Sequence, residues 1–380
     1  MHSPKIHVIS ILRQVISEKR EVFSVIREAI SNSKDAGATA VSINVEHQNQ
    51  RLNLEIIDNG EGMSRKDLPN FFGLGFSDKK RTENVIGEKG LGTKLYFNSD
   101  FLEVWTKPTN GKRGYYCKLE SPIESLEKNV LPNYQIKWIK ETEKQEQGTK
   151  IKISALATGS ARDFIYGEKL KNYIQWNTAA GNISYLFGKK QKFTVSVAIA
   201  NTLNKFNVSR HEIPVDNRLK SFDRGQHPDS YAARFKPFCV ILNQYTKPVK
   251  VEIAGAIVGS EGHIIKDKRI KKKYKGMFLA KDYMIVKDIN EDIFRGSGEW
   301  QSMHIVVNCQ KLELGMGRDN FINTGGGSVY AEVVECLKSF VNSIKVGQPF
   351  IFKGVSYENG ETCAGKLYTE LSKLKEEYSN

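Results

Sequence analysis

The alternation of apolar and polar residues along the chain predicts a helix followed by strands. The helix ends at Gly37, because residues 38–45 (ATAVSINV) alternate with the period of a strand. A second strand follows at residues 51–57 (RLNLEII), and a third lies at residues 150–156 (KIKISAL). The first part of the chain therefore combines helices with strands.

The second half of the chain repeats this mixture. Residues 163–176 (DFIYGEKLKNYIQW) predict a helix that links two domains, and residues 328–344 predict an amphipathic helix. Strand-like stretches lie within residues 188–200, 237–259, 277–286 and 304–314. We therefore expect a second domain with a four-stranded sheet and helices, followed by a charged helical tail at residues 366–378.

Three polar residues stand on one face of the first helix. Glu28, Asn32 and Asp35 occur at i, i+4 and i+7, which places them on one stripe of a helix with 3.6 residues per turn. Two carboxylates and an amide oxygen on one face can bind a hard cation and activate a water molecule. Taken alone, the triplet also fits an ordinary solvated face, where polar residues recur at the same spacing.

A glycine-rich motif follows the second strand, at Asp58-Asn-Gly60-Glu-Gly62-Met63. An aspartate at a strand end can accept a hydrogen bond from an adenine amino group, and glycines let the backbone approach a base and ribose. Asp-Asn-Gly is also common in hairpin turns. Residues 63–76 do not read as a pairing strand, so a ligand site is the better interpretation.

A second glycine-rich segment lies at Gly87-Glu-Lys89-Gly90-Leu-Gly92-Thr93-Lys94. It precedes a helical pattern, so its backbone N–H groups can bind phosphates, and its two lysines add positive charge. The segment is not a P-loop, because a P-loop needs lysine before the hydroxyl residue and here threonine precedes lysine. The glycine spacing likewise excludes the dinucleotide-binding fingerprint.

Together with Gln147-Gly148-Thr149-Lys150, these motifs resemble, in sequence order, the four blocks of the GHKL ATPase superfamily, which includes gyrase, the heat-shock chaperone, histidine kinases and MutL. They span roughly residues 22–153. The resemblance implies an α/β (α+β sandwich) fold, with a Bergerat-type GHKL ATP-binding domain followed by a smaller α/β transducer domain. Among members of the superfamily, the chain looks most similar to MORC-like or MutL-like ATPase–transducer modules.

The resemblance also implies a role for each motif residue. Asp58 would recognise adenine, Asn32 would hold Mg²⁺, and Glu28 would take a proton from the attacking water. Asp35 would support the base pocket or the magnesium waters, and Thr149 would close the pocket beneath the adenine. The remaining ATP-binding positions are Gly60, Gly62 and Met63 beside the base, and Gly87, Lys89, Gly90, Gly92 and Thr93 at the phosphates.

The same resemblance suggests where the domains begin and end. We expect an N-terminal arm at residues 1–20, an ATP-binding domain at 21–160 with a lid at about 63–92, a transducer domain at 161–345 and a tail at 346–380. In the transducer domain, Arg318 is the first candidate and Lys311 the second for a basic residue that contacts the ATP γ-phosphate. The loop that carries Arg318 fits an ordinary turn equally well.

Charge and cysteine usage narrow the choice of partners. The 380 residues carry a net charge of +14, and seven of the ten residues from Lys266 to Lys275 are basic. This favours nucleic acid as a partner, although such a run also suits a solvated loop. Five scattered cysteines without a C-x-x-C pair indicate reduced thiols in the cytoplasm, or in the nucleus of a eukaryote. No apolar run reaches membrane-spanning length, so no membrane partner is expected.

These features predict a switch that binds ATP and hydrolyses it slowly. ATP would close the lid and drive homodimer formation, and the dimer would act on DNA or on a DNA-bound partner, with a separate effector chain as a further candidate partner. The alternatives are a chaperone-like ATPase that acts on proteins and a non-catalytic ATP-binding module that binds nucleic acid. A histidine protein kinase fits poorly, because only His2 and His7 precede Glu28 and leave no room for a phosphoacceptor hairpin.

Overall fold

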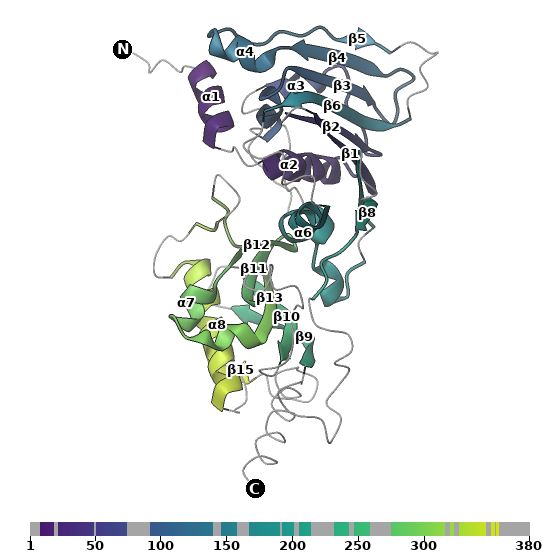
Figure 1. The fold of residues 1–380 in the computed structure, drawn as a ribbon. Coiled ribbons are helices and arrows are strands. Elements are labelled where there is room, and N and C mark those ends of the chain that lie inside the picture. Colours follow the sequence, from purple (N-terminus) through teal and green to yellow (C-terminus); the bar gives the residue numbers. More distant parts are fainter. Residues whose placement is uncertain are drawn as a thin grey trace. The chain divides into compact units, whose positions relative to one another are not determined.

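The fold is taken from a computed structural model of the chain (Figure 1). The structure describes residues 8–18, 22–48, 51–73, 92–139, 146–157, 167–190, 192–200, 205–213, 232–242, 247–258, 275–315, 320–322, 327–346, 351–353 and 355–356. The chain divides into two compact units. The first comprises Met1–Asn182 and Gln191–His211, and the second comprises Ile183–Lys190 and Glu212–Asn380.

The first unit is built on an eight-stranded mixed sheet with the strand order β5-β4-β3-β6-β2-β1-β7-β8. Its neighbouring strands are antiparallel, except that β1 and β7 run parallel. The order makes Asp58, at the end of β2, the pairing neighbour of Thr149 in β6. The strands are β1 (Ala40–Gln48), β2 (Arg51–Asp58), β3 (Phe101–Lys107), β4 (Tyr115–Glu120), β5 (Lys137–Trp138), β6 (Gly148–Leu156), β7 (Thr194–Ile199) and β8 (Lys205–Val208).

Most helices of the first unit lie on one face of this sheet (Figure 1). In β2, Leu54 and Ile56 are buried beneath them while Ile57 is exposed on the other face, as strand alternation requires. The ring of Phe23 stacks on that of Tyr173 at 4.7 Å, which joins two of these helices. The helical segments are α1 (Val8–Glu18), α2 (Val22–Asp35), α3 (Leu68–Phe72), η1 (Gly92–Phe97), α4 (Pro122–Glu127), α6 (Gly167–Asn177) and η2 (Ala179–Gly181).

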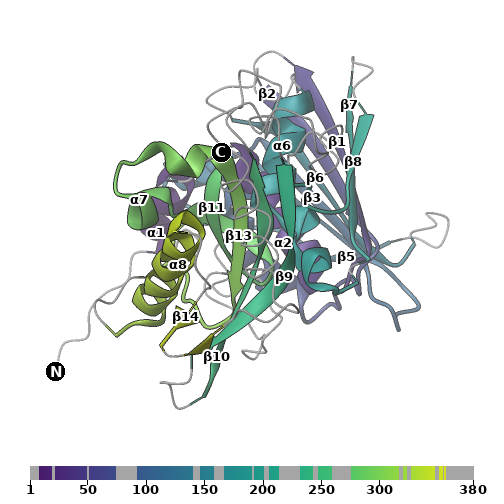
Figure 2. The same cartoon turned by 90° about the horizontal axis from the view of Figure 1, so that it is seen from below.

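The second unit contains a five-stranded sheet with the order β12-β11-β13-β10-β9, in which β11 and β13 are parallel. Helix α8 lies along this sheet (Figure 2), with Leu337 and Phe340 fully buried and the Phe340 ring 5.3 Å from that of Phe238. The elements are η3 (Ser184–Phe187), β9 (Ala232–Leu242), β10 (Val249–Val258), β11 (Gly276–Lys281), β12 (Met284–Asp288), α7 (Asn290–Phe294), η5 (Gly298–Ser302), β13 (Met303–Cys309), α8 (Val329–Val346), β14 (Ile351–Phe352) and β15 (Val355–Ser356).

The predicted mixed α/β architecture is confirmed, but three details differ. The first unit extends past residue 160, because residues 194–199 form β7 and pair with β1. Residues 277–286 form two strands, because Asp282 and Tyr283 adopt φ values of 53° and 60° and turn the chain between β11 and β12. The second sheet has five described strands in place of the four expected, and its strand β13 already ends at Cys309.

Several predicted features lie outside the described residues. These are the central part of the lid (residues 74–91, with Gly87, Lys89 and Gly90), Arg318, the basic run up to residue 274, and the tail at residues 366–378. Within the part of the chain that the structure describes, no helix combines the length and the apolar character needed to cross a membrane.

Candidate nucleotide-binding site

The carboxylate of Asp58 is buried at the end of β2 and accepts a hydrogen bond on each oxygen. The Gly60 N–H donates to Oδ1 at 2.9 Å, and the Ser33 hydroxyl of α2 donates to Oδ2 at 3.0 Å. Burial raises the pKa of Asp58, while these two bonds and a main-chain hydrogen bond from Thr149 act in the opposite direction. The carboxylate is thus held in one orientation between the strand and the helix.

The loop that follows Asp58 is fixed against β3. The Met63 N–H donates to Thr106 Oγ1 at 2.7 Å, and this hydroxyl lies 3.2 Å from Thr149 Oγ1. Gly62 has a φ of 67°, and a Cβ at this position would lie 2.1 Å from the Lys107 carbonyl oxygen, so only glycine fits here. The sequence-predicted residues that meet in this corner are Asp58, Gly60, Gly62, Met63 and Thr149.

A second polar cluster forms where α2 faces η1. A Cβ at Gly92 would lie 1.7 Å from Glu28 Cδ, so the absence of a side chain at Gly92 lets η1 contact the carboxylate. The Lys94 side chain is fully buried, and its Nζ donates to the Phe71 carbonyl oxygen at 2.9 Å and to Thr93 Oγ1 at 2.6 Å. A buried cation therefore lies beside the predicted general base and its glycine neighbour.

Tyr96 connects the two corners of the site. Burial raises the pKa of its hydroxyl, and the negative charges of Glu28 and Asp58 raise it further. The Tyr96 hydroxyl and Asn32 Nδ2 are both buried without a hydrogen-bond partner among the described residues. The nearby Asn32 side chain acts in the opposite direction and lowers the pKa of the Tyr96 hydroxyl, although the two groups form no regular hydrogen bond. The two orphaned groups mark a place where a polar ligand would complete the structure.

The donor set fits a magnesium–nucleotide ligand. Asn32 provides an amide oxygen of the type that Mg²⁺ accepts, and the orphaned Nδ2 and Tyr96 hydroxyl can donate to phosphate oxygens. Gly92 and Thr93 begin η1, so their backbone N–H groups have no carbonyl partner within that helix, and Lys94 supplies positive charge. We infer that phosphates would lie near η1 and the base near Asp58.

Burial makes Lys94 a source of pH dependence. Burial lowers the pKa of Lys94 from 10.5 to about 8, and the charge of Glu28 opposes part of this shift. At pH values between about 8 and 10.5, Lys94 is protonated in the unfolded chain but deprotonated in the folded chain. Unfolding therefore takes up a proton, and the stability of the first unit should rise with pH, by about 1 kcal/mol per pH unit.

Urea denaturation of the wild type and of Lys94→Met across this pH range tests the effect. The difference in the free energy of unfolding, wild type minus Lys94→Met, should increase as the pH rises above 8. Because the variant keeps every other lysine and tyrosine, comparison with it removes the contribution of their titration at alkaline pH. Parallel pH profiles for the two proteins would contradict the assigned burial of a titrating Lys94.

The other predicted residues lie in different situations. Asp35 is half-buried in the last turn of α2, and Lys311 is exposed in the turn after β13 of the second unit. Sequence reasoning missed Ser33, Thr106 and Tyr96 as site residues. Thr106 carried a signal, because it is the polar member of the buried alternation Leu102, Val104 and Thr106 in β3.

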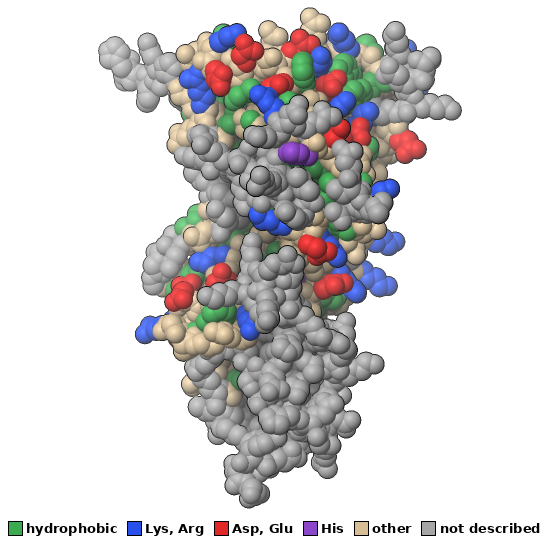
Figure 3. Space-filling view, in the orientation of Figure 1, with side chains coloured by type: hydrophobic (Ala, Val, Ile, Leu, Met, Phe, Trp, Pro, Cys, Tyr) green, Lys and Arg blue, Asp and Glu red, His purple; other side chains and the backbone are tan. Residues whose placement is uncertain are grey.

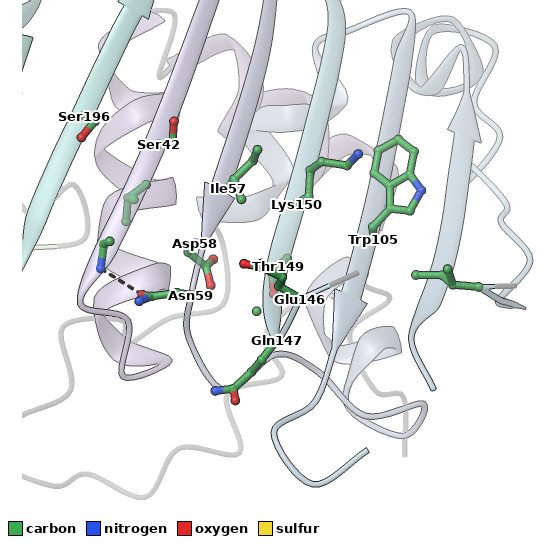
Figure 4. Close-up of a pocket in the computed structure, with 14 residues that line it drawn as sticks. Ser42, Ile57, Asp58, Asn59, Trp105, Glu146, Gln147, Thr149, Lys150 and Ser196 are labelled. Carbon is green, nitrogen blue, oxygen red and sulfur yellow. Dashed lines mark hydrogen bonds between the residues drawn. The ribbon is translucent and has the colours of Figure 1, made fainter. Parts of the chain in front are cut away.

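A hollow of about 730 Å³ lies at the same end of the sheet but on the opposite face (Figure 4). Trp105, Lys150, Ile57, Ser42 and Ser196 line it in a row across five strands. Strand alternation directs the Ile57 side chain into this hollow and the Asp58 carboxylate toward α2. Asp58 and Thr149 also line the hollow, so it shares these two residues with the candidate nucleotide site, although the Asp58 carboxylate is bound on the other face.

Comparison with protein families agrees with this geometry. Residues 20–149 match the family model described as histidine kinase-, DNA gyrase B- and HSP90-like ATPase. This segment is therefore similar to GHKL ATPases, and we call it the GHKL segment. The GHKL segment contains α2, the Asp58 loop, η1 and the start of β6, so it contains both clusters described above. The resemblance expected from the four motifs is thus confirmed.

Curated relatives share only part of this chain. They are a subunit of type 2 DNA topoisomerase 6 from two strains of Saccharolobus islandicus, Y.N.15.51 (Yellowstone #2) and L.S.2.15 (Lassen #1), and each is 29% identical over 150 residues. The match covers 36% of this chain and 28% of each relative. The chain therefore spans less than a third of the length of these relatives.

Proposed function

We propose that this chain binds Mg·ATP between α2, the Asp58 loop and η1, and acts as a slowly hydrolysing molecular switch. One observation carries the proposal. The helix-covered face of a single sheet holds an oriented Asp58 carboxylate and a Glu28 carboxylate against Gly92, with orphaned buried polar groups in between. The match of residues 20–149 to an ATPase family model supports the same conclusion.

Each residue of the site has a physical role in this proposal. Asp58 accepts the adenine amino group, because its oxygens are already oriented by Gly60 and Ser33. Asn32 holds Mg²⁺, and the ion when bound neutralises charge on the phosphates. Glu28 takes the proton of the attacking water, and Lys94 stabilises negative charge beside it. Thr149 and Met63 form the walls of the base pocket, Asp35 supports this pocket, and Thr93 binds phosphate.

ATP would close the lid and favour a homodimer, with Lys311 or Arg318 sensing the γ-phosphate. The relatives are named as a subunit of a DNA topoisomerase, which supports DNA as the target and a separate chain as the effector. We also propose that the protein is located in the cytoplasm or the nucleus. A chaperone-like ATPase and a non-catalytic nucleic-acid-binding module are the rival functions.

Replacing Asp58 with asparagine should weaken ATP binding on the order of 10- to 100-fold. An amide accepts on one atom only, and the lost interaction with a charged acceptor is worth about 1.5–3 kcal/mol. Calorimetry with Mg·ATP measures the change. Glu55→Gln is a matched control, because Glu55 lies on the same strand, on the opposite face, and accepts from Asn44 at 3.0 Å.

The same proteins test the switch. Size-exclusion chromatography with ADP, ATP and a non-hydrolysable analogue, with and without DNA, should give a dimer with ATP or the analogue for the wild type and for Glu55→Gln but not for Asp58→Asn. Wild-type ATP affinity in Asp58→Asn would mean that Asp58 is only a turn residue. Dimers that form without nucleotide would argue against the switch while leaving ATP binding intact.

A further inference from the structure

An exposed tryptophan lies close to two guanidinium groups at the edge of the first sheet. Trp138 of β5 is 50% exposed, unusually open for so large an apolar side chain. The Cζ atoms of Arg65 and Arg113 lie 5.9 and 5.6 Å from its ring centroid, and the Tyr115 ring lies 4.9 Å away. These distances allow cation–π contact, so the arginines are already arranged around an aromatic surface.

Backbone hydrogen bonds join the three segments that carry these side chains. The Ile139 N–H donates to the Gly114 carbonyl oxygen at 3.0 Å, which ties the Trp138 strand to the turn that holds Arg113. The Thr109 N–H donates to the Glu61 carbonyl oxygen at 2.9 Å, which ties that turn to the loop that leads to Arg65. The arrangement is therefore a property of the fold and not of one flexible loop.

Positive charge at this edge has no acidic counterpart among the described residues. Lys112 and Lys137 are exposed beside Arg113 and Trp138 in the chain, and neither they nor the two arginines form an ion pair with a described carboxylate. On the face drawn in Figure 3, basic and acidic side chains of the described residues are interspersed.

Among the described residues, the acidic ones closest to Arg65 along the chain are engaged in other directions. The Asp67 carboxylate accepts from the Ser64 hydroxyl at 2.5 Å and from the Ser64 N–H at 3.2 Å. The Glu61 carboxylate approaches Gly37, where an added Cβ would lie 3.9 Å from its Oε1. Neither carboxylate forms an ion pair with the cations around Trp138, so within the described part of this edge positive charge stands together with an open aromatic ring.

We propose that this edge, the Trp138 patch, binds single-stranded nucleic acid. The patch consists of Trp138, Tyr115, Arg65, Arg113, Lys112 and Lys137. An unpaired base stacks on the Trp138 ring, while the arginines and lysines contact the neighbouring phosphates. Duplex bases are already stacked on each other and offer no free face, and an acidic peptide would use the cations but not the ring. The proposal is independent of the nucleotide site.

Fluorescence anisotropy with a labelled oligothymidine tests the patch on the full chain. Trp138→Ala should bind on the order of ten-fold more weakly, since one base–aromatic stack is worth about 1–3 kcal/mol. Arg65→Ala/Arg113→Ala should lower the slope of log affinity against log salt by about 0.7 for each phosphate that the variant no longer neutralises. Binding of the oligonucleotide should quench tryptophan fluorescence in the wild type, and much less in Trp138→Ala.

Two variants are matched controls at the far end of the same sheet. Phe101→Ala removes another exposed ring beneath a lysine (Lys118 Nζ, 4.7 Å from the centroid), and Arg51→Ala removes another exposed guanidinium, which is paired with Asp100. Both should bind the oligonucleotide as the wild type does. Trp138→Phe, which keeps a ring, should fall between the wild type and Trp138→Ala, which separates stacking from a folding defect.

Three results would overturn the proposal. One is wild-type affinity and salt slope in both patch variants. Another is duplex binding that exceeds single-strand binding and is unchanged in Trp138→Ala. In the third, the wild type binds polyglutamate but not the oligonucleotide, and the double variant Arg65→Ala/Arg113→Ala no longer binds polyglutamate. That result would assign the patch to an acidic protein. ATP affinity should be the same in all these variants, so failure here leaves the nucleotide site untouched.

Discussion

Glu28→Ala is expected to bind Mg·ATP with nearly unchanged affinity while its turnover falls by about 10²–10⁴-fold, the usual contribution of a general base. The reason is that the base acts on the attacking water, so the ground-state complex with ATP does not depend on it. In the structure the Glu28 carboxylate meets the backbone at Gly92, the first residue of the predicted phosphate-binding turn that is described. Binding by calorimetry and steady-state phosphate release separate the two effects.

Two further variants test whether the loss of turnover in Glu28→Ala comes from the loss of a general base. Glu28→Gln keeps the shape of the side chain against Gly92 and removes only the basic group, so it should lose turnover as Glu28→Ala does. Glu55→Gln, on the opposite face of β2, should hydrolyse ATP like the wild type. Full activity in Glu28→Gln would eliminate Glu28 as the base. Loss of ATP binding in both Glu28 variants would instead make it a binding residue.

Local alternation predicted the strands of the first unit but not all of their partners. Residues 38–45 and 51–57 alternate cleanly, and they form β1 and β2 because one face of each is buried. Residues 194–199 were equally recognisable as a strand, yet they belong to the first sheet. The parallel pairing of β7 with β1 joins residues about 150 positions apart, and no periodicity within either segment records it.

The motifs similarly predicted the family and many of the residues that meet, but not the contacts between them. The GHKL resemblance assigned both Asp58 and Thr149 to the adenine pocket, and the structure shows that they are neighbours because β2 pairs with β6. Ser33 and Tyr96 were missed, since a hydroxyl in a helix or next to a glycine-rich turn has no distinctive spacing. Their role comes from burial beside Asp58 and Glu28, which only the tertiary structure provides.

Gly92→Ala is expected to lose most ATP turnover, on the order of 100-fold, without unfolding the first unit. The new Cβ would lie 1.7 Å from Glu28 Cδ and 1.9 Å from Oε1, so the two groups cannot occupy their present positions together. The overlapping atoms belong to the end of a flexible side chain, so the carboxylate can turn away at a stability cost of about 1–3 kcal/mol. The displaced base then no longer meets the water that it should activate.

A double-mutant comparison distinguishes this mechanism from a direct effect on the phosphates. In the Glu28→Ala background, where the obstructing side chain is gone, Gly92→Ala should reduce the remaining turnover very little, because the two changes remove the same function. Gly298→Ala is the control for an ordinary glycine, since a Cβ there would meet only Gln301 Nε2 at 3.6 Å. If Gly92→Ala instead abolishes ATP binding in both backgrounds, the glycine is needed for backbone contact with the phosphates, and its contact with Glu28 is incidental.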